Sequence, residues 1–474
     1  MKYLFFLLML ICGKPLLCQV IQKEFKKETE LQQDKIFTYE EFLGYVKKYH
    51  PLIKQADLVL STGEANLLKA RGSFDPKIEV DYERKEFKKT EYFDQLNTTF
   101  KIPTWYGIEF KANFEKNTGE FLNPNLTVPD DGLYSLGVSF SLAQGLLINK
   151  RMATLRKARY FKNQTLAERN ILINNLLFEA SAAYFDWLEA TNEQAIQASF
   201  LENASLRIKA VKKSIEVGDK AAIDSIEAGI IVQNRKLNLE AATLKKRKSA
   251  LIVSNYLWIK GIPVELKENA LPVRPDVKTV KSSLILQEKN ALDIARVLEN
   301  HPKIISLDAK IDGLTVERSL KRNKLLPKIN VQYNFLTSDF YETNTFNLDN
   351  YKTFINISVP LFLRKERGDL ELANLKLRDA NLDRMATTIQ LQNKIKAVQI
   401  EIASLRKQKK LIEDITKDYQ ILVTAEERKF FLGESSLFLI NSREQKLIDT
   451  KLKENKLMAK TLMAVAKLYN ALGV

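Results

Sequence analysis

The sequence predicts a mostly helical protein with a smaller β section, built from two internal repeats. Only 16 glycines and 12 prolines interrupt 474 residues, so the elements between breaks must be long. Residues 142–217 and 366–431 contain no proline, and a helix of about 70 residues would be about 100 Å long. Other stretches alternate apolar and polar side chains with a period of two, as half-buried strands do.

The N-terminus has the features of a secretory signal peptide. Lys2 precedes an apolar run at residues 3–12, which is too short to span a bilayer. We expect cleavage near residue 18 or 19, with a lipid-anchored Cys18 as the alternative. Residues 1–19 are therefore assigned to the signal and residues 20–36 to an extended arm. Both cysteines lie in the signal, so a mature chain would have no disulfide.

The first predicted repeat covers residues 37–260. Thr38 and Glu41 form a capping-box pattern, so a helix is expected from there to Arg71, with a candidate kink at Pro51. Strands are expected at about 77–142, followed by two long helices. The alternating apolar side chains are Ile78, Val80 and Tyr82; Leu96, Thr98, Phe100 and Ile102; Tyr106, Ile108, Phe110, Ala112 and Phe114; and Tyr134, Leu136, Val138 and Phe140.

A proline-containing linker at residues 261–281 precedes the second predicted repeat, residues 282–474, with strands at about 328–359. HPLIKQADLVL and FDPKIEVDY recur 251 positions later as HPKIISLDAKI and LLPKINVQY, and SIEVGDKAAIDSIEA resembles KFFLGESSLFLINSR 215 positions later. The second long helix has coiled-coil spacing. Its apolar positions are Leu391, Ile395, Val398, Ile402, Leu405, Ile412, Tyr419 and Val423, with a second stripe at Leu411 and Ile415.

Catalysis has little support in this sequence. The histidines, His50 and His301, precede prolines at matching helix starts, which favours a structural role. No Cys/His cluster, phosphate loop or dinucleotide motif occurs, so no enzyme activity, cofactor or metal site is predicted. The formal charge of +16 would suit nucleic acid, but an export signal opposes that partner, and the basic runs are interpreted as solvated helix faces.

The predicted strands suit a transmembrane barrel. Each has about ten residues, with one aromatic or aliphatic face for lipid and one polar face for water. Four to six strands cannot close a barrel, and open edges are not tolerated in lipid. Several chains must therefore contribute strands to one barrel.

The doubled order of helix, HP, strands, long helix and glycine turn resembles the TolC family of outer-membrane efflux and secretion channels. The residues that carry the resemblance are HPLIKQA and HPKIISLDA, FDPKIEV and LLPKINV, ISVPLFLRKERGDL at 357–370 and LGESSLFLINSREQKL at 432–447. The resemblance implies a homotrimer in which long coiled-coil helices form an α-barrel joined to a shared transmembrane β-barrel. It also implies an outer-membrane location, helices in the periplasm, and partners in a periplasmic adaptor and an inner-membrane pump.

The resemblance also assigns site residues to the two glycine turns, which mark the periplasmic tips in that family. Adaptor contacts are expected at Val217, Gly218, Gly433 and Ser436. Aperture residues are expected at Asp224, Glu227, Phe430, Phe431 and Leu439. The family's acids six and nine positions after the glycine are kept in the first copy, whereas the second copy has Leu439 and Ser442 there.

The predicted function is passive conduction of substrate from an inner-membrane pump and adaptor to the outside, in tripartite efflux or type I secretion. The alternative is a periplasmic coiled-coil scaffold without a pore. The first strand section has 66 positions from Pro76 to Leu142, against 34 from Pro327 to Leu361. This leaves room for an extra hairpin, which would either widen the barrel or lie outside it as a lid.

Overall fold

The computed structural model describes residues 36–284, 294–343 and 347–473. The predicted signal peptide and nearly all of the predicted arm lie outside the described residues. The chain divides into two compact units. Of the described residues, the helical unit contains 36–54, 172–284 and 393–473, and the strand unit contains the rest. Each unit combines segments of both predicted repeats, so the repeat boundaries at 37–260, 261–281 and 282–474 stay a prediction.

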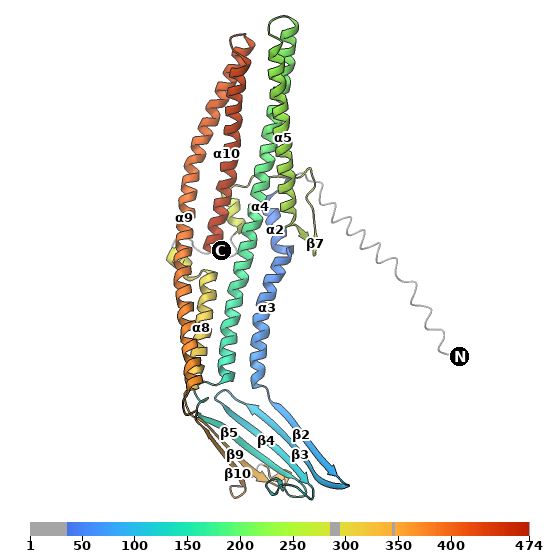
Figure 1. Cartoon of the computed structure of the whole chain (residues 1–474), viewed down its shortest axis with the longest axis vertical. Coiled ribbons are helices and arrows are strands. Elements are labelled where there is room, and N and C mark those ends of the chain that lie inside the picture. Colours follow the sequence, from blue (N-terminus) through green and yellow to red (C-terminus); the bar gives the residue numbers. More distant parts are fainter. Residues whose placement is uncertain (1–35, 285–293, 344–346, 474) are drawn as a thin grey trace, which may run out of the picture. The chain divides into compact units, whose positions relative to one another are not determined.

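Four helices form one layer of the strand unit: α3 (Pro51–Arg71), α8 (Pro302–Asn323) and the first parts of α4 (Lys150–Glu216) and α9 (Arg364–Phe431). Ion pairs give their order. Arg169 of α4 lies 2.7 Å from Asp57 of α3, and Lys157 of α4 lies 2.6 Å from Glu317 of α8. Lys321 of α8 lies 2.7 Å from Asp369 of α9. The layer therefore runs α3, α4, α8, α9, as Figure 1 shows.

The strands of this unit form one antiparallel six-stranded sheet in the order β10-β9-β5-β4-β3-β2. Their bounds are β2 Lys77–Phe87, β3 Thr90–Pro103, β4 Ile108–Thr118, β5 Leu133–Ala143, β9 Lys328–Thr337 and β10 Tyr351–Ser358. All four strands predicted in the first section are present. The strand expected from Tyr106 begins two residues later, because Gly107 has a φ of +73° and belongs to the turn before β4.

The register of the sheet separates its side chains into two faces. Ile78, Phe100, Ala112, Leu136 and Phe335 pair across five successive strands on one face. The next row, on the other face, is polar on β2 to β5, and in it Thr99 donates a 2.6 Å hydrogen bond to Asn113. Apolar side chains on the first face remain exposed, among them Ile78 at 71% and Phe110 at 53%. Along the edges, every residue of β2 and β10 is exposed.

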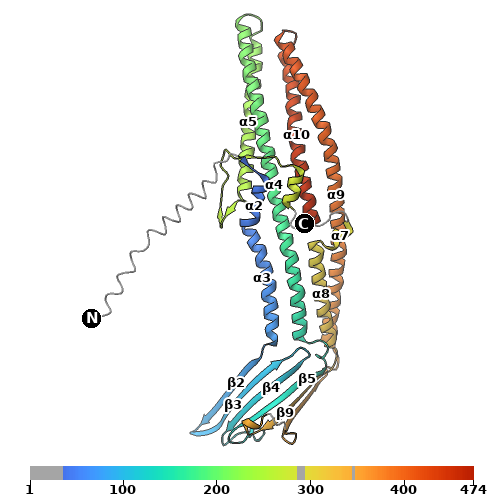
Figure 2. The same cartoon turned by 180° about the vertical axis from the view of Figure 1, so that it is seen from behind.

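The helical unit contains α2 (Tyr39–Tyr49), the second parts of α4 and α9, α5 (Ile223–Ser254), α6 (Val277–Leu284) and α10 (Leu437–Leu472). Two-residue strands pair as β1 (Ile36–Phe37) with β8 (Leu271–Pro272), and β6 (Trp258–Ile259) with β7 (Ile262–Pro263). In Figures 1 and 2, α4–α5 and α9–α10 are two antiparallel hairpins within this unit. Tyr39, Tyr184, Phe185 and Trp187 are among its most buried side chains.

Three sequence predictions about the helices can be compared with this fold. Long helices are confirmed, since α4 has 67 residues and α9 has 68. The candidate kink at Pro51 is a full break between α2 and α3. Of the coiled-coil stripe on α9, every member except Tyr419 is buried. The second stripe, Leu411 and Ile415, is 62% and 44% exposed in the single chain.

Both histidines have the structural role that the sequence predicted. His50 Nδ1 accepts a hydrogen bond of 3.2 Å from the Leu52 backbone, and His301 Nδ1 accepts one of 3.1 Å from the Lys303 backbone. Both side chains are buried, at 7% and 6% exposure. Two matching positions of the predicted repeats therefore cap α3 and α8 in the same way, because each supplies an acceptor to the free N–H groups of a first helical turn.

Candidate functional site

The two glycine turns end α4 and α9 with the same hydrogen-bond pattern. The Gly218 and Asp219 backbone N–H groups donate to Ile215 at 3.0 Å and Ser214 at 2.8 Å. In the second turn, Gly433 and Glu434 donate to Phe430 at 3.2 Å and Lys429 at 2.9 Å. Both are Schellman motifs, in which two late carbonyl groups of the helix are satisfied by a residue with positive φ and its successor. The glycine φ values are +82° and +77°.

Glycine is needed at these turns for its backbone conformation and not for space. A Cβ at Gly218 or Gly433 would meet nothing within 4 Å, but it would be strained at positive φ. The helices that follow begin differently. Ser436 caps α10 by accepting a hydrogen bond of 3.3 Å from the Leu439 backbone, whereas α5 has no side-chain cap at Ala222.

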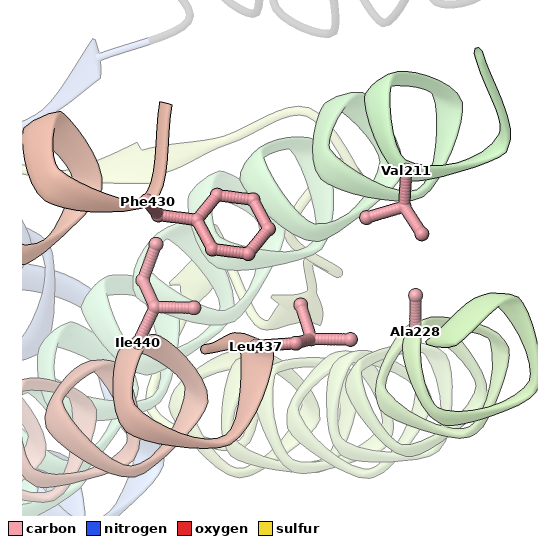
Figure 3. Close-up of a cluster of buried hydrophobic side chains, with 5 residues drawn as sticks. All are labelled: Val211, Ala228, Phe430, Leu437 and Ile440. Atoms are coloured by element: carbon pink, nitrogen blue, oxygen red, sulfur yellow. The ribbon is translucent and has the colours of Figure 1, made fainter. Parts of the chain in front are cut away.

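A cluster of buried apolar side chains joins the two hairpins just below the turns. Val211 of α4 and Ala228 of α5 face Phe430 of α9 and two α10 residues, Leu437 and Ile440 (Figure 3). Phe430 is only 6% exposed. The Lys220 ammonium group lies 4.1 Å from its ring centre, which is the geometry of a cation–π contact. Within one chain, Phe430 is therefore a contact between the hairpins.

The other residues predicted at the tips are more accessible. Val217, Phe431 and Leu439 are 65%, 76% and 44% exposed. Asp224 and Glu227 are partly exposed on the same stretch of α5, and Glu227 accepts a long hydrogen bond of 3.5 Å from Asn441 of α10. The structure thus brings Phe430 and Glu227 to the contact between the hairpins. It leaves Val217, Phe431 and Leu439 free for other contacts.

A buried ion cluster beside these residues was missed from the sequence. The Glu444 carboxylate of α10 has a side chain 1% exposed and lies 2.9 Å from Arg207 of α4 and 3.4 Å from Arg235 of α5. Arg207 also reaches Glu427 of α9 at 3.4 Å, and Arg235 donates a 2.7 Å hydrogen bond to Gln445. One carboxylate is thus shared by two guanidinium groups, and all four helices of the two hairpins take part.

A signal for this cluster was present in the sequence. Glu444 lies in the spacing Leu437, Ile440, Glu444, Leu447, whose steps of three and four are those of a coiled-coil seam. A charge in such a seam must be paired when it is buried, because an isolated buried carboxylate is very costly. Its partners, Arg207 and Arg235, lie more than 200 positions away and have no such signature.

Comparison with known proteins bears out the resemblance found in the sequence. Residues 294–474 match the family model described as outer membrane efflux protein. The C-terminal part of the chain is thus similar to outer membrane efflux proteins, as the TolC-family resemblance in the sequence predicts. No curated protein sequence matches the chain.

Solved structures of outer-membrane channels share the fold of this chain. The CusC structure is 14% identical, with a TM-score of 0.65, and 91% of each chain is covered. The Campylobacter jejuni CmeC channel is 14% identical, with a TM-score of 0.64, and the match covers 91% of this chain and 85% of CmeC. The Neisseria gonorrhoeae MtrE channel is 11% identical, with a TM-score of 0.65, and the match covers 92% of this chain and 88% of MtrE.

These structural matches confirm the predicted fold class of long helices joined to a β section. Among the described residues, no helix combines the length and the apolar character needed to cross a bilayer. In the same part of the chain, no group of three or more His, Cys, Asp or Glu side chains is placed to hold a metal ion.

Proposed function

We propose that this protein is the trimeric outer-membrane channel of a tripartite efflux or type I secretion system. It passively conducts substrate from an inner-membrane pump and a periplasmic adaptor to the outside. The observation that carries this proposal is the six-stranded sheet, which has an exposed apolar face and two edge strands, β2 and β10, whose outer sides pair with no strand in the described part of the chain. Such a sheet is unstable in lipid until its edges are paired and its apolar face meets hydrocarbon.

Three copies would satisfy both requirements. Strand β2 of one subunit would pair with β10 of the next, so that the polar face of the sheet lines a common lumen. The exposed second stripe on α9, Leu411 and Ile415, supports the same arrangement, because it gives α9 an apolar face for a neighbouring subunit. In this assembly the helices would continue the pore into the periplasm.

The helical tips would receive the adaptor. Val217, Gly218, Gly433 and Ser436 lie at the two turns and are exposed, so they remain our proposed adaptor contacts. Asp224, Phe431 and Leu439 would line the aperture, while Phe430 and Glu227 would hold the hairpins behind it. Opening would be an iris-like shift of the hairpins biased by adaptor binding. Three Asp224 carboxylates around one axis would favour cations.

The test is single-channel recording of the detergent-purified protein in a planar bilayer, with Asp224→Asn beside the wild type. We expect stepwise currents and a lower preference for cations in the variant. Glu268→Gln is the matched control, since Glu268 is an exposed acid paired with Arg247 in the segment between β7 and β8. A purified protein that is monomeric and needs no detergent would contradict the proposal.

A further inference from the structure

We propose that the hairpin β3–β4 is an inserted part of the barrel wall, which widens the trimeric barrel to eighteen strands. Three copies with six strands each give this number. The inference rests on the proposed function, because it assumes that three sheets close into one barrel. It decides between the two positions that the sequence leaves open for the longer first strand section, a wider barrel or an external lid.

The internal repeat identifies β3–β4 as the inserted pair. Strands β2 and β9 begin at Lys77 and Lys328, which are 251 positions apart and follow α3 and α8. Strands β5 and β10 both lead into a long helix, α4 or α9. In the second half β9 pairs directly with β10, whereas in the first half β3 and β4 lie between β2 and β5. Because two strands are added, every neighbouring pair of strands stays antiparallel. The insertion therefore leaves β2 and β10 as the edge strands, with their directions unchanged.

The inserted hairpin is paired along its length on both sides. Strand β3 is registered against β2 from Thr90 to Lys101 and against β4 from Asp94 to Pro103. Strand β4 pairs with β5 from Ile108 to Glu115. A lid outside the barrel would have to leave this ladder, and removing a central pair of strands would break two ladders of backbone hydrogen bonds. Its strands of 14 and 11 residues are also long enough to cross the hydrocarbon.

The two faces of the sheet continue through the inserted hairpin without a change of character. On the apolar face, Ile102 and Phe110 continue the row that contains Val138 and Tyr333. On the polar face, the Lys111 ammonium group donates a 3.2 Å hydrogen bond to Gln332 of β9, across β5. The hairpin thus presents the same side to lipid and the same side to water as the strands around it, which a solvent-exposed lid would not require.

The hairpin also brings the sheet to the width of the helical layer in the same unit. Four neighbouring helices about 9–10 Å apart make a layer about 35–40 Å wide. Six strands about 4.8 Å apart, tilted by about 40°, cover about 38 Å, whereas four strands cover about 25 Å. For eighteen strands the backbone diameter is about 36 Å, against about 24 Å for twelve, so the cross-section is roughly doubled.

The test measures which faces of the hairpin are open to water in the full-length trimer, reconstituted in nanodiscs. Ala112→Cys and Asn113→Cys place a thiol on the apolar and the polar face of β4. Val138→Cys and Ser139→Cys are the matched controls on β5, a wall strand in either case. A positively charged methanethiosulfonate reagent is the probe, and the wild-type chain gives the background rate. We expect the apolar-face thiols of both strands to react at least about tenfold more slowly, because charge is excluded from hydrocarbon.

Alternating reactivity on both strands supports the wall assignment. Alternation on β5 without alternation on β4 would place the hairpin outside the membrane and overturn this inference, while leaving the proposed channel intact. Absence of alternation on β5 would show that the sheet does not lie in the membrane, and would overturn the proposed function itself.

Discussion

Replacing Glu444 with glutamine should loosen the contact between the two helical hairpins. The carboxylate lies 2.9 Å from Arg207 and 3.4 Å from Arg235, and the exposure of its side chain is only 1%. Removing one partner of a buried ion pair costs about 3–5 kcal/mol, because the remaining charge stays buried without compensation. Glutamine keeps one acceptor oxygen, and Glu427 and Gln445 still reach the two guanidinium groups. We therefore expect a loss of about 2–3 kcal/mol.

Hydrogen exchange of backbone amides is the suitable assay, since it reports local opening of individual helices. A loss of about 2–3 kcal/mol corresponds to exchange about 30- to 150-fold faster. The effect should be concentrated in the ends of α4 and α10 near the turns. Glu427→Gln is the matched control, because Glu427 contacts the same Arg207 at 3.4 Å but its side chain is 36% exposed. Exposed pairs contribute about 1 kcal/mol or less, so exchange should rise less than about fivefold.

Two results would refute this reasoning. Exchange in Glu444→Gln within twofold of the wild type would mean that the buried ion cluster does not stabilise the hairpins. An equal effect of Glu427→Gln would mean that burial is not what gives the Glu444 pair its strength. Glu444→Leu, which removes the acceptor as well as the charge, should be more destabilising than Glu444→Gln.

Three further predictions concern the tips, the helical layer and the sheet. Gly218→Ala and Gly433→Ala should each destabilise their turn by about 1–2 kcal/mol, which faster amide exchange would show. Gly313→Ala is the control, because a Cβ there lies in open space within α8 and should stabilise the folded chain by up to about 1 kcal/mol. The hydrogen bond from Lys157 lowers the pKa of Glu317 below 4.5. The ionised Glu317 carboxylate therefore stabilises the folded chain above that pH, and this contribution is lost as the pH falls through the lowered pKa. The melting temperature should therefore fall on acidification from pH 6 to pH 3, and less steeply in Glu317→Gln; equal slopes would contradict the assignment. Deleting residues 88–130 should leave a functional channel of lower conductance, because Asp131 and Gly132 form a suitable two-residue turn that joins Phe87 of β2 to Leu133 of β5 with their faces preserved. Unchanged conductance would argue against a wider barrel.

Local patterns in the sequence predicted much of the fold. Apolar residues spaced three and four positions apart from Leu391 to Val423 identified the buried stripe of α9. The alternation of apolar and polar residues at 77–142 identified four strands. These predictions succeed because the periods of 3.6 and 2 follow from the backbone of a single element. The positive φ at Gly218 and Gly433 is also a local demand, so both turns could be located from the residues around them.

Other features of the site depend on contacts between distant elements. Phe430 and Phe431 are neighbours in the sequence, yet the first is 6% exposed and the second 76%. No local pattern separates them, because the difference comes from packing of α9 against α4 and α10. Likewise, the two arginines around Glu444 come from α4 and α5, and each looks like an ordinary solvated helix residue in the sequence.

By itself, the sequence determined the long helices, the two-faced strands, the glycine turns and the TolC-family resemblance, because each is set by backbone geometry or by a repeated order of short motifs. Only the tertiary structure decided that the extra hairpin lies within the sheet, between β2 and β5, since period-two alternation fixes the faces of a strand but not its neighbours. Only the tertiary structure, too, joined Arg207, Arg235 and Glu444. The sequence contains many charged residues that could pair, and the packing of the four helices is what brings these three together.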